Sequence, residues 1–175
     1  MIKNSLLLCN INDRECVVFC MMDYILKKVS YEDASKVFNL LQYARNCRSE
    51  YVQNKIKDDR IYEYRWFESR FNEQNRDTYL ILDTRYNLMG FVMVNSETKV
   101  IEKGHRLSEL LILPQFRRLF LGQRVCQDVF QMYQGEWEVE PIYEDLRSYY
   151  FFKRAIEYYT NRVCTYMKKT FVFKK

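Results

Sequence analysis

The segment from Leu110 to Arg124 holds the residues whose types and spacing point most directly to chemistry. It reads as an apolar strand ended by Pro114, a short basic turn and the start of a helix. The first backbone N–H groups of a helix have no partner within the helix, and they attract phosphate. Arg117, Arg118 and Arg124 add positive charge there. The pattern predicts a phosphate-binding turn, in which Gly122 permits close approach of a ligand; a surface loop with solvated arginines is the alternative.

Cysteine and histidine, the other reactive residue types, form no comparable pattern. The six cysteines contain no C-x-x-C pair and His105 is the only histidine, so we expect no metal site. His105 reads as a solvated loop residue or a group that titrates near neutral pH. Cys126, inside a helical pattern, reads as a buried inert thiol or a covalent acyl carrier. The short apolar run at 6–8 does not resemble a signal peptide, so we expect reduced thiols in the cytoplasm.

The elements that must position this turn alternate between strand-like and helix-like hydrophobic periodicity. Ser30 is the expected N-cap of the first helix, and Asp83 to Met89 forms the loop of an expected antiparallel hairpin. The expected strands are 24–29, 78–82, 90–95, 106–113, 137–142, 163–167 and 171–173, and the expected helices are about 31–51, about 55–72, 122–133 and 145–159. This order predicts an α/β protein with a mixed sheet.

Composition limits the class of protein. The 175 residues are 48% hydrophobic with 4 Gly and 2 Pro, which excludes a disordered chain and disfavours a loop-rich β-sandwich. We expect one domain at 22–175 after a weakly organised N-terminal extension at 1–21, with Met21 or Met22 as alternative natural starts. The net charge of +5 is concentrated at 153–175, where seven basic residues accompany one acid. Such a patch suits a phosphorylated ligand or nucleic acid, or is a solvated face.

Four short motifs in register resemble the GNAT superfamily of acyl-CoA-dependent N-acetyltransferases. Residues 117–122, Arg-Arg-Leu-Phe-Leu-Gly, resemble its R/Q-x-x-G-x-G/A turn, and 107–114 look like its fourth strand. Residues 132–139 and 145–160 are similar to the F-P-G-x-W-x-V and N-x-x-A-x-x-F-W-x-x-x-I-x-x-Y-T segments of one bacterial branch. The resemblance, over roughly 24–173, implies a mostly antiparallel twisted mixed sheet flanked by about four helices. It also implies transfer of an acetyl group from acetyl-CoA to a primary amine.

The resemblance implies that acetyl-CoA is held by the end of the fourth strand, the turn and the last long helix. The residues concerned are Leu111, Ile112, Leu113, Arg117, Arg118, Leu119, Phe120, Leu121, Gly122, Gln123, Asp145, Ser148 and Phe151. Backbone amides from Leu111 to Leu113 would polarise the thioester carbonyl. The chain departs from the family pattern at Phe120, where the family has a glycine, and at Asp145, which replaces an asparagine.

The same resemblance places the catalytic groups. Glu109, on the fourth strand, is the candidate general base for the amine, directly or through water; a strand-edge salt bridge is the alternative. Many family members have a tyrosine general acid where this chain has Phe152, which has no proton to donate. Tyr149 and Tyr150, one turn earlier, are candidates to supply a hydroxyl, with aromatic core packing as the alternative.

Three classes of function follow from the sequence. The first is an acetyl-CoA-dependent N-acetyltransferase that acts on an amine of unknown identity by direct attack. The second is a GNAT-like domain that has lost catalysis and binds acyl-CoA or a protein partner, which Phe120 and Phe152 favour. The third is a basic nucleic-acid-binding module, for which no recognition motif is present. The sequence predicts a cytoplasmic protein without a membrane span. It leaves the acceptor and the oligomeric state open, a homodimer included.

Overall fold

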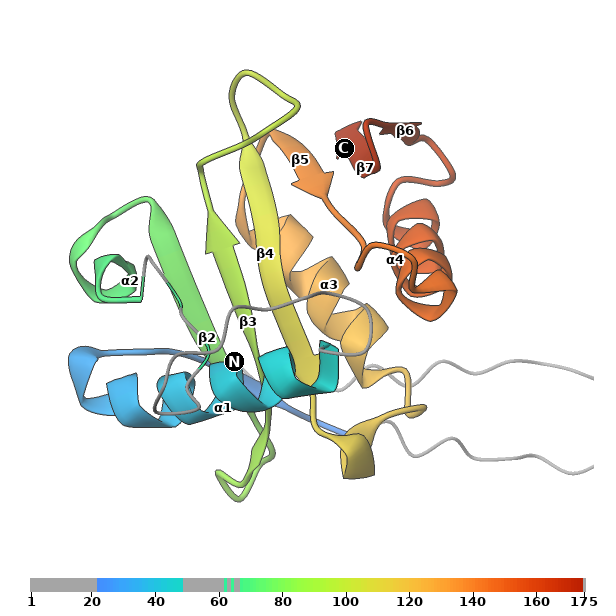
Figure 1. Cartoon of the computed structure of the whole chain (residues 1–175). Coiled ribbons are helices and arrows are strands. Elements are labelled where there is room, and N and C mark those ends of the chain that lie inside the picture. Colours follow the sequence, from blue (N-terminus) through green and yellow to red (C-terminus); the bar gives the residue numbers. More distant parts are fainter. Residues whose placement is uncertain (1–21, 49–61, 63, 65–66, 175) are drawn as a thin grey trace, which may run out of the picture.

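The computed structural model describes residues 22–48, 62, 64 and 67–174 (Figure 1). The extension expected at 1–21 and most of the helix expected at 55–72 lie outside these residues. Seven described strands form one sheet in the order β1-β2-β3-β4-β5-β7-β6. They are β1 (Ile25–Lys28), β2 (Arg76–Leu82), β3 (Leu88–Asn95), β4 (His105–Ile112), β5 (Glu136–Val139), β6 (Thr165–Met167) and β7 (Thr170–Lys174). All neighbouring pairs are antiparallel except β4 and β5, so the expected mixed, mostly antiparallel sheet is confirmed.

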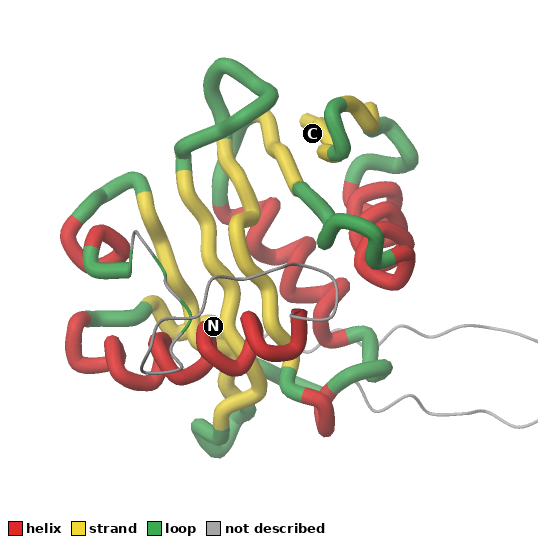
Figure 2. The backbone as a smooth tube through the Cα atoms, viewed as in Figure 1, coloured by secondary structure: helices red, strands yellow, loops and turns green. Residues whose placement is uncertain are grey.

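Helices cover both faces of this sheet (Figures 1 and 2). Helix α1 (Ala34–Arg48) crosses one face, and α3 (Leu121–Met132) lies on the other face beside α4 (Leu146–Tyr159). The short α2 (Ser69–Asn72) precedes β2, and two short 3₁₀ turns, η1 (Tyr31–Asp33) and η2 (Pro114–Phe116), precede α1 and follow β4. Ser30 caps η1 and forms a capping box with Asp33, as the sequence predicts for this helix start.

Two apolar cores fix the helices to the sheet. Strand side chains alternate between the two faces, so neighbouring residues of one strand contribute to different cores. The core under α1 contains Val37, Leu41, Leu80, Phe91 and Leu111. The core under α3 and α4 contains Val125, Val129, Phe130, Trp137 and Ile156. Because both faces are covered, β2 and β3 are buried almost throughout, and β3 and the second half of β2 are mostly apolar.

The sheet opens between β4 and β5. Their parallel pairing runs only from His105 with Trp137 to Leu107 with Val139, where β5 ends. The residue after Leu107, Ser108, is an extra residue opposite β3, because Met93 pairs with Glu109 while Val94 pairs with Leu107. This bulge bends β4 at the point where the two strands part. The chain beyond β5 then turns into α4, which leaves a gap beside the second half of β4.

Candidate active site

A cavity of about 830 Å³ lies in the gap beside β4. Its walls come from β4, the turn into α3, the first half of α4 and the last turn of α1. Of the residues expected from the sequence, the cavity is lined by Glu109, Leu111, Ile112, Arg117, Arg118, Phe120, Leu121, Gly122, Gln123, Asp145, Ser148, Tyr150 and Phe151. Leu113, Leu119 and Tyr149 are not part of this lining.

The start of α3 forms one end of the cavity. The N-cap residue, Phe120, makes no side-chain hydrogen bond that would cap the helix. The first backbone bond of the helix runs from the Arg124 N–H to the Phe120 carbonyl, at 3.1 Å. The N–H groups of Leu121, Gly122 and Gln123 precede that bond, and all three residues line the cavity. This arrangement is suited to an anion, because helix geometry leaves these donors without intrahelical acceptors.

Two residues of the turn have left-handed backbone conformations. Arg118 has φ 62° and Phe120 has φ 56°. This region costs a residue with a Cβ roughly 1–2 kcal/mol, a cost that glycine avoids. Phe120 is 56% exposed. The chain therefore keeps the glycine-type turn geometry with a phenylalanine at the position where the family motif has glycine.

The turn arginines have different partners. The Arg117 Nε donates a hydrogen bond to the Ile112 carbonyl at 2.8 Å and ties the turn to the end of β4. Arg124 does not line the cavity: its Nη1 donates to the Met22 carbonyl, and its guanidinium lies 5.0 Å from the centre of the Tyr24 ring. The prediction that Arg124 adds positive charge to the phosphate-binding turn is therefore wrong. Arg147 and Arg154 of α4 line the cavity instead, seven residues apart on one helix face, a spacing that could have revealed them.

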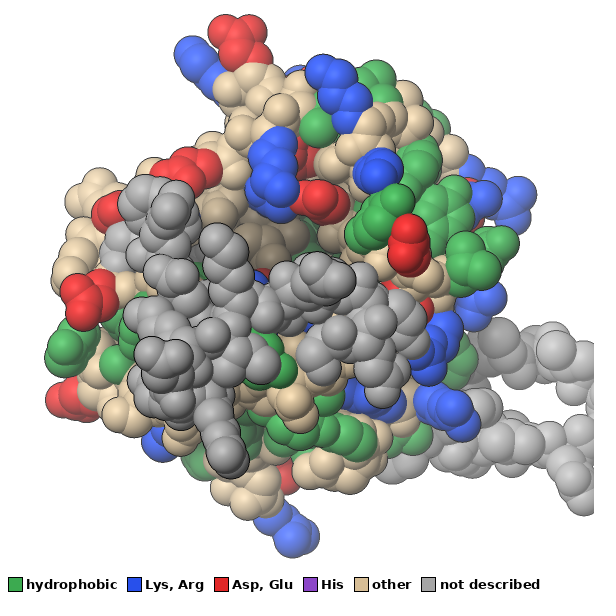
Figure 3. All heavy atoms as spheres, viewed as in Figure 1, with side chains coloured by type: hydrophobic (Ala, Val, Ile, Leu, Met, Phe, Trp, Pro, Cys, Tyr) green, Lys and Arg blue, Asp and Glu red, His purple; other side chains and the backbone are tan. Residues whose placement is uncertain are grey.

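Gly122 has a packing role that the sequence did not reveal. A Cβ at this position would lie 3.1 Å from the Phe151 ring of α4. The absence of a side chain therefore lets the first turn of α3 and the aromatic face of α4 meet at the cavity wall. Hydrophobic side chains gather on the surface over α4 beside Lys and Arg side chains (Figure 3). Tyr150 and Phe151 are exposed residues of this helix.

The backbone of β4 presents only alternate N–H groups to the cavity. The Leu113 N–H donates to the Met89 carbonyl on β3, at 2.9 Å, so it is not available to a ligand. Backbone N–H groups of successive residues in an antiparallel strand point to opposite sides within the sheet. The N–H of Leu111 therefore also points toward β3, whereas the N–H groups of Leu110 and Ile112 point away from it. The contact of Arg117 with the Ile112 carbonyl agrees with that direction. Of the amides expected at 111–113, only that of Ile112 points toward the gap.

Glu109 and Arg48 form the opposite end of the cavity. The bulge at Ser108 turns Glu109 toward the face that carries α1. Its side chain is 9% exposed, and its Oε2 lies 2.6 Å from the Nη1 of Arg48, the last residue of α1. The salt bridge given above as an alternative for Glu109 is thus present, and Arg48 is a cavity residue that the sequence did not reveal. Cys47 and Ala44 complete this end.

Asp145 and Ser148 fix the start of α4. The Asp145 carboxylate accepts the Arg147 N–H at 3.0 Å and caps the helix, and the Arg147 Nε lies 3.4 Å from the same oxygen. The Ser148 Oγ accepts the Ile142 N–H at 3.0 Å. The Asp145 carboxylate is therefore next to a guanidinium, and the Ser148 hydroxyl holds α4 against the chain that leaves β5.

The two tyrosines proposed as hydroxyl donors have different surroundings. The Tyr149 ring packs against Tyr166 and Phe171, with centroid distances of 5.1 and 5.2 Å, outside the cavity lining. Tyr150 lines the cavity and is 60% exposed. Phe152, at the family's tyrosine position, also lines the cavity. Tyr150 is therefore the tyrosine that the structure brings to the site.

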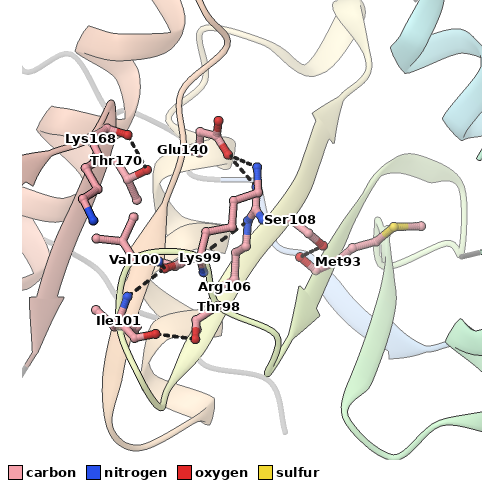
Figure 4. Close-up of polar contacts among 11 residues, drawn as sticks. Met93, Thr98, Lys99, Val100, Ile101, Arg106, Ser108, Glu140, Lys168 and Thr170 are labelled. Carbon is pink, nitrogen blue, oxygen red and sulfur yellow. Dashed lines mark hydrogen bonds and ion pairs between the residues drawn. The ribbon is translucent and has the colours of Figure 1, made fainter. Parts of the chain in front are cut away.

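A network of charged residues joins the loop between β3 and β4, the start of β4 and the chain that leaves β5 (Figure 4). Glu140 lines the cavity, and its Oε2 lies 2.6 Å from the Arg106 Nη2 and 2.7 Å from the Lys99 Nζ. Glu138, almost fully buried, accepts backbone N–H groups of Lys99 and Val100 at 2.7 and 2.8 Å. The network holds the loop between β3 and β4 and leaves Glu140 paired with two cations.

The remaining reactive residues lie away from the cavity. His105 packs against the rings of Tyr133 and Trp137 and is not a loop residue, because β4 begins with it. Cys126 is fully buried, and this burial raises the pKa of its thiol, so it has no route to an acyl group. Within the described ranges, no group of three or more His, Cys, Asp or Glu residues could hold a metal ion. No helix in that part of the chain is long and apolar enough to cross a membrane.

Comparison with known proteins relates the fold to solved structures. No family model and no curated protein matches the chain. A spermidine N-acetyltransferase from Vibrio cholerae, in complex with CoA and spermine, is 13% identical with a TM-score of 0.54, over 75% of this chain and 79% of that chain. A protein from Bacillus halodurans, in a mutant form, is 14% identical with a TM-score of 0.59, over 73% and 88%.

A third similar structure is the GCN5-related glucosamine N-acetyltransferase region of a fungal multi-domain β-N-acetylglucosaminidase. It is 11% identical with a TM-score of 0.57, over 90% of this chain and 18% of that chain. These proteins share the arrangement of strands and helices with this chain at low sequence identity. The chain therefore has the fold of the GCN5-related N-acetyltransferases, the GNAT fold.

Proposed function

We propose that this protein is an acetyl-CoA-dependent N-acetyltransferase that transfers the acetyl group to a primary amine by direct attack. One observation carries the proposal. A single cavity on a GNAT fold joins an uncapped helix start with arginines, at one end, to the carboxylate of Glu109 at the other. The complex of a structural neighbour with CoA and spermine supports both substrates of this reaction.

In this proposal the phosphates of acetyl-CoA bind the start of α3. The N–H groups of Leu121, Gly122 and Gln123 donate to the pyrophosphate, and Arg117 and Arg118 add positive charge. The acyl arm then runs along β4, where the Ile112 and Leu110 N–H groups face the gap. A donor there stabilises the negative charge that develops on the thioester oxygen.

The chemical step needs an amine with a lone pair. The amine nitrogen attacks the thioester carbon, the carbon–sulfur bond breaks, and CoA leaves as a thiolate that takes up a proton. The nitrogen loses one proton, which Glu109 accepts directly or through water. To do so, the Glu109 carboxylate must give up or share its contact with Arg48. Tyr150 is the candidate hydroxyl donor to the thiolate.

Acetyl-CoA binding tests the proposal. A ligand present at ~100 times its dissociation constant stabilises the folded state by about 2.7 kcal/mol, so acetyl-CoA should raise the melting temperature. Replacing both Arg117 and Arg118 with Ala should weaken binding at least tenfold and shrink the shift. Arg162→Ala, which changes an exposed arginine outside the cavity lining, is the matched control. No shift at millimolar acetyl-CoA would refute the proposal.

A second candidate is a GNAT-like domain that binds acyl-CoA without turnover. Phe152 at the tyrosine position and the Glu109–Arg48 ion pair favour it. Acetyl-CoA would still raise the melting temperature of such a domain, and replacing Arg117 and Arg118 with Ala would still reduce that rise. No amine would be acetylated. A cytoplasmic location remains part of the proposal, in keeping with three free thiols, Cys47, Cys126 and Cys164, in the described part of the chain.

A further inference from the structure

All the carboxylates among the described residues that line the cavity have a basic partner. Glu109 pairs with Arg48 at 2.6 Å. Glu140 lies between Arg106 and Lys99 at 2.6 and 2.7 Å, and Asp145 lies 3.4 Å from the Arg147 Nε. An acceptor with several ammonium groups therefore meets no unpaired carboxylate in this lining. Binding it through these carboxylates would displace their basic partners and leave those cations without an anion.

Positive charge exceeds negative charge around the same cavity. Arg48, Arg117, Arg118, Arg147 and Arg154 line it, against Glu109, Glu140 and Asp145. The excess arginines lie on the turn before α3 and on α4, where the proposed cosubstrate carries its phosphates. At the other end the charge is balanced between one guanidinium and one carboxylate, half-buried and buried respectively. A polycation is disfavoured at both ends, by repulsion at the first and by competition at the second.

Resting on the proposed function, we propose that the acceptor is a small zwitterion, which carries a carboxylate close to its primary amine. Arg48 binds the carboxylate, and Glu109 receives the amine. The contact with Glu109 runs through the Nη1 of Arg48, and a guanidinium has five N–H donors in a planar fork that suits a second carboxylate. Free amino acids are the chemical class with this charge pattern.

Exchange of ion pairs explains why a zwitterion fits. When its ammonium approaches Glu109 and its carboxylate approaches Arg48, two charges enter and two are already present, so the group of four is neutral. No buried charge is left alone, which would otherwise be costly. The ammonium then loses one proton to solvent before attack and a second proton to Glu109 during attack. The acetylated product is an amide with a carboxylate, and CoA leaves with its thiol protonated.

The experiment compares matched acceptors with the purified full chain and acetyl-CoA. Each set contains a free amino acid, its carboxamide and its decarboxylated amine. The sets cover α-amino acids and longer ω-amino acids. Spermidine and spermine are tested in the same assay as polyamine acceptors. Mass spectrometry of the N-acetyl product gives kcat/KM. We expect at least one acid to be used about 10²-fold better than its carboxamide and its decarboxylated amine. The carboxamide has the less basic amine, so a preference for the acid does not arise from easier deprotonation.

Variants of Arg48 separate recognition from folding. Arg48→Met should reduce the acid-to-carboxamide ratio toward one, chiefly by raising KM for the acid. Arg48→Lys keeps a positive charge without the planar fork, so it should retain part of the ratio. If Arg48→Met does not fold, the Lys variant still tests the proposal. Arg85→Met, on the exposed β2–β3 hairpin outside the cavity lining, should leave the ratio as it is.

The outcomes distinguish this inference from the proposed function. Equal or better use of carboxamides, simple amines or polyamines would overturn the inference and leave the acetyltransferase proposal intact. Acetyl-CoA binding without turnover of any zwitterion in the sets would also overturn it. An acid preference that survives both Arg48 variants would remove Arg48 from recognition and with it the inference. Absence of acetyl-CoA binding would refute the proposed function itself.

Discussion

The two ends of the cavity are built in different ways. At the α3 end, the groups aimed at the ligand are backbone N–H groups of Leu121, Gly122 and Gln123, and the nearby Arg118 and Arg154 are exposed. At the α1 end, the groups are side chains, Arg48 and Glu109, and they already contact each other. The first end is open to an anion without rearrangement, whereas the second must exchange partners when a ligand arrives.

This difference indicates how specificity is divided in the molecule. A helix start binds phosphate through geometry that many sequences can supply. A paired Arg and Glu select by charge pattern, and a change of either residue alters which molecule is accepted. In the proposed function, the α3 end binds the constant cosubstrate and the α1 end binds the particular acceptor.

The largest expected effect falls on the α1 end. Glu109→Gln removes the charge while keeping the size of the side chain, so kcat/KM for the acceptor should fall about 10²–10⁴-fold if Glu109 is the base. Acetyl-CoA affinity should stay near that of the unchanged protein, and the deficit should shrink at high pH, where more of the amine is already neutral. Steady-state kinetics and thermal shifts give both quantities. Glu102→Gln, on an exposed loop, is the control; well-folded Glu109→Gln with full turnover would remove the base assignment.

A smaller effect is expected at the α3 end. Phe120→Gly removes a ring from the cavity wall and places a glycine, which adopts φ 56° without strain. The relieved backbone strain is roughly 1–2 kcal/mol of folding free energy, from which the entropy cost of glycine is subtracted. Acetyl-CoA should bind about tenfold tighter if the ring crowds the pyrophosphate, which corresponds to about 1.4 kcal/mol of relieved crowding. The backbone strain is present with and without ligand, so its relief should raise folding stability and not affinity. Titration calorimetry measures this directly. Weaker binding would mean that the ring itself contacts the cosubstrate.

The smallest expected effect is a difference between the two ends in how strongly binding depends on salt concentration. Exposed arginines are screened, and a half-buried ion pair is screened much less. Raising sodium chloride from low to high concentration should therefore raise the dissociation constant of acetyl-CoA several-fold, while KM for the acceptor changes less. Equal responses would contradict the division between an exposed and a shielded end.

The fold could be predicted well because its signals are local and periodic. The apolar runs of β2 and β3, the hairpin loop between them and the Ser30 helix start all appear in the sequence as they do in the structure. The strand expected at 137–142 ends at Val139, because the chain leaves the sheet before Pro141. Among the described residues of the helix expected at 55–72, only Ser69–Asn72 is helical; residues 62, 64, 67 and 68 are not, so the expectation is wrong there.

The site could be predicted where it depends on backbone pattern and not where it depends on contacts across the fold. The turn from Arg117 to Gln123 was recognisable because strand, turn and helix start are consecutive. Arg48 was not, because it lies 61 positions from Glu109 in sequence and meets it only when α1 crosses the sheet. Tyr149 and Tyr150 are adjacent, and the packing of α4 alone decides which of them reaches the cavity.

The extra residue in β4 has a consequence for how such a chain changes over evolutionary time. Leu107 and Glu109 pair with the adjacent residues Val94 and Met93, and Ser108 is the residue between them that has no partner on β3. Loss of this one codon would therefore leave a regular ladder, in which the later residues of β4 keep their partners and their faces. What would be lost is the bend that the bulge gives β4 where it parts from β5. We expect a single in-frame deletion to change how the sheet opens beside β4 without moving Glu109 to the other face.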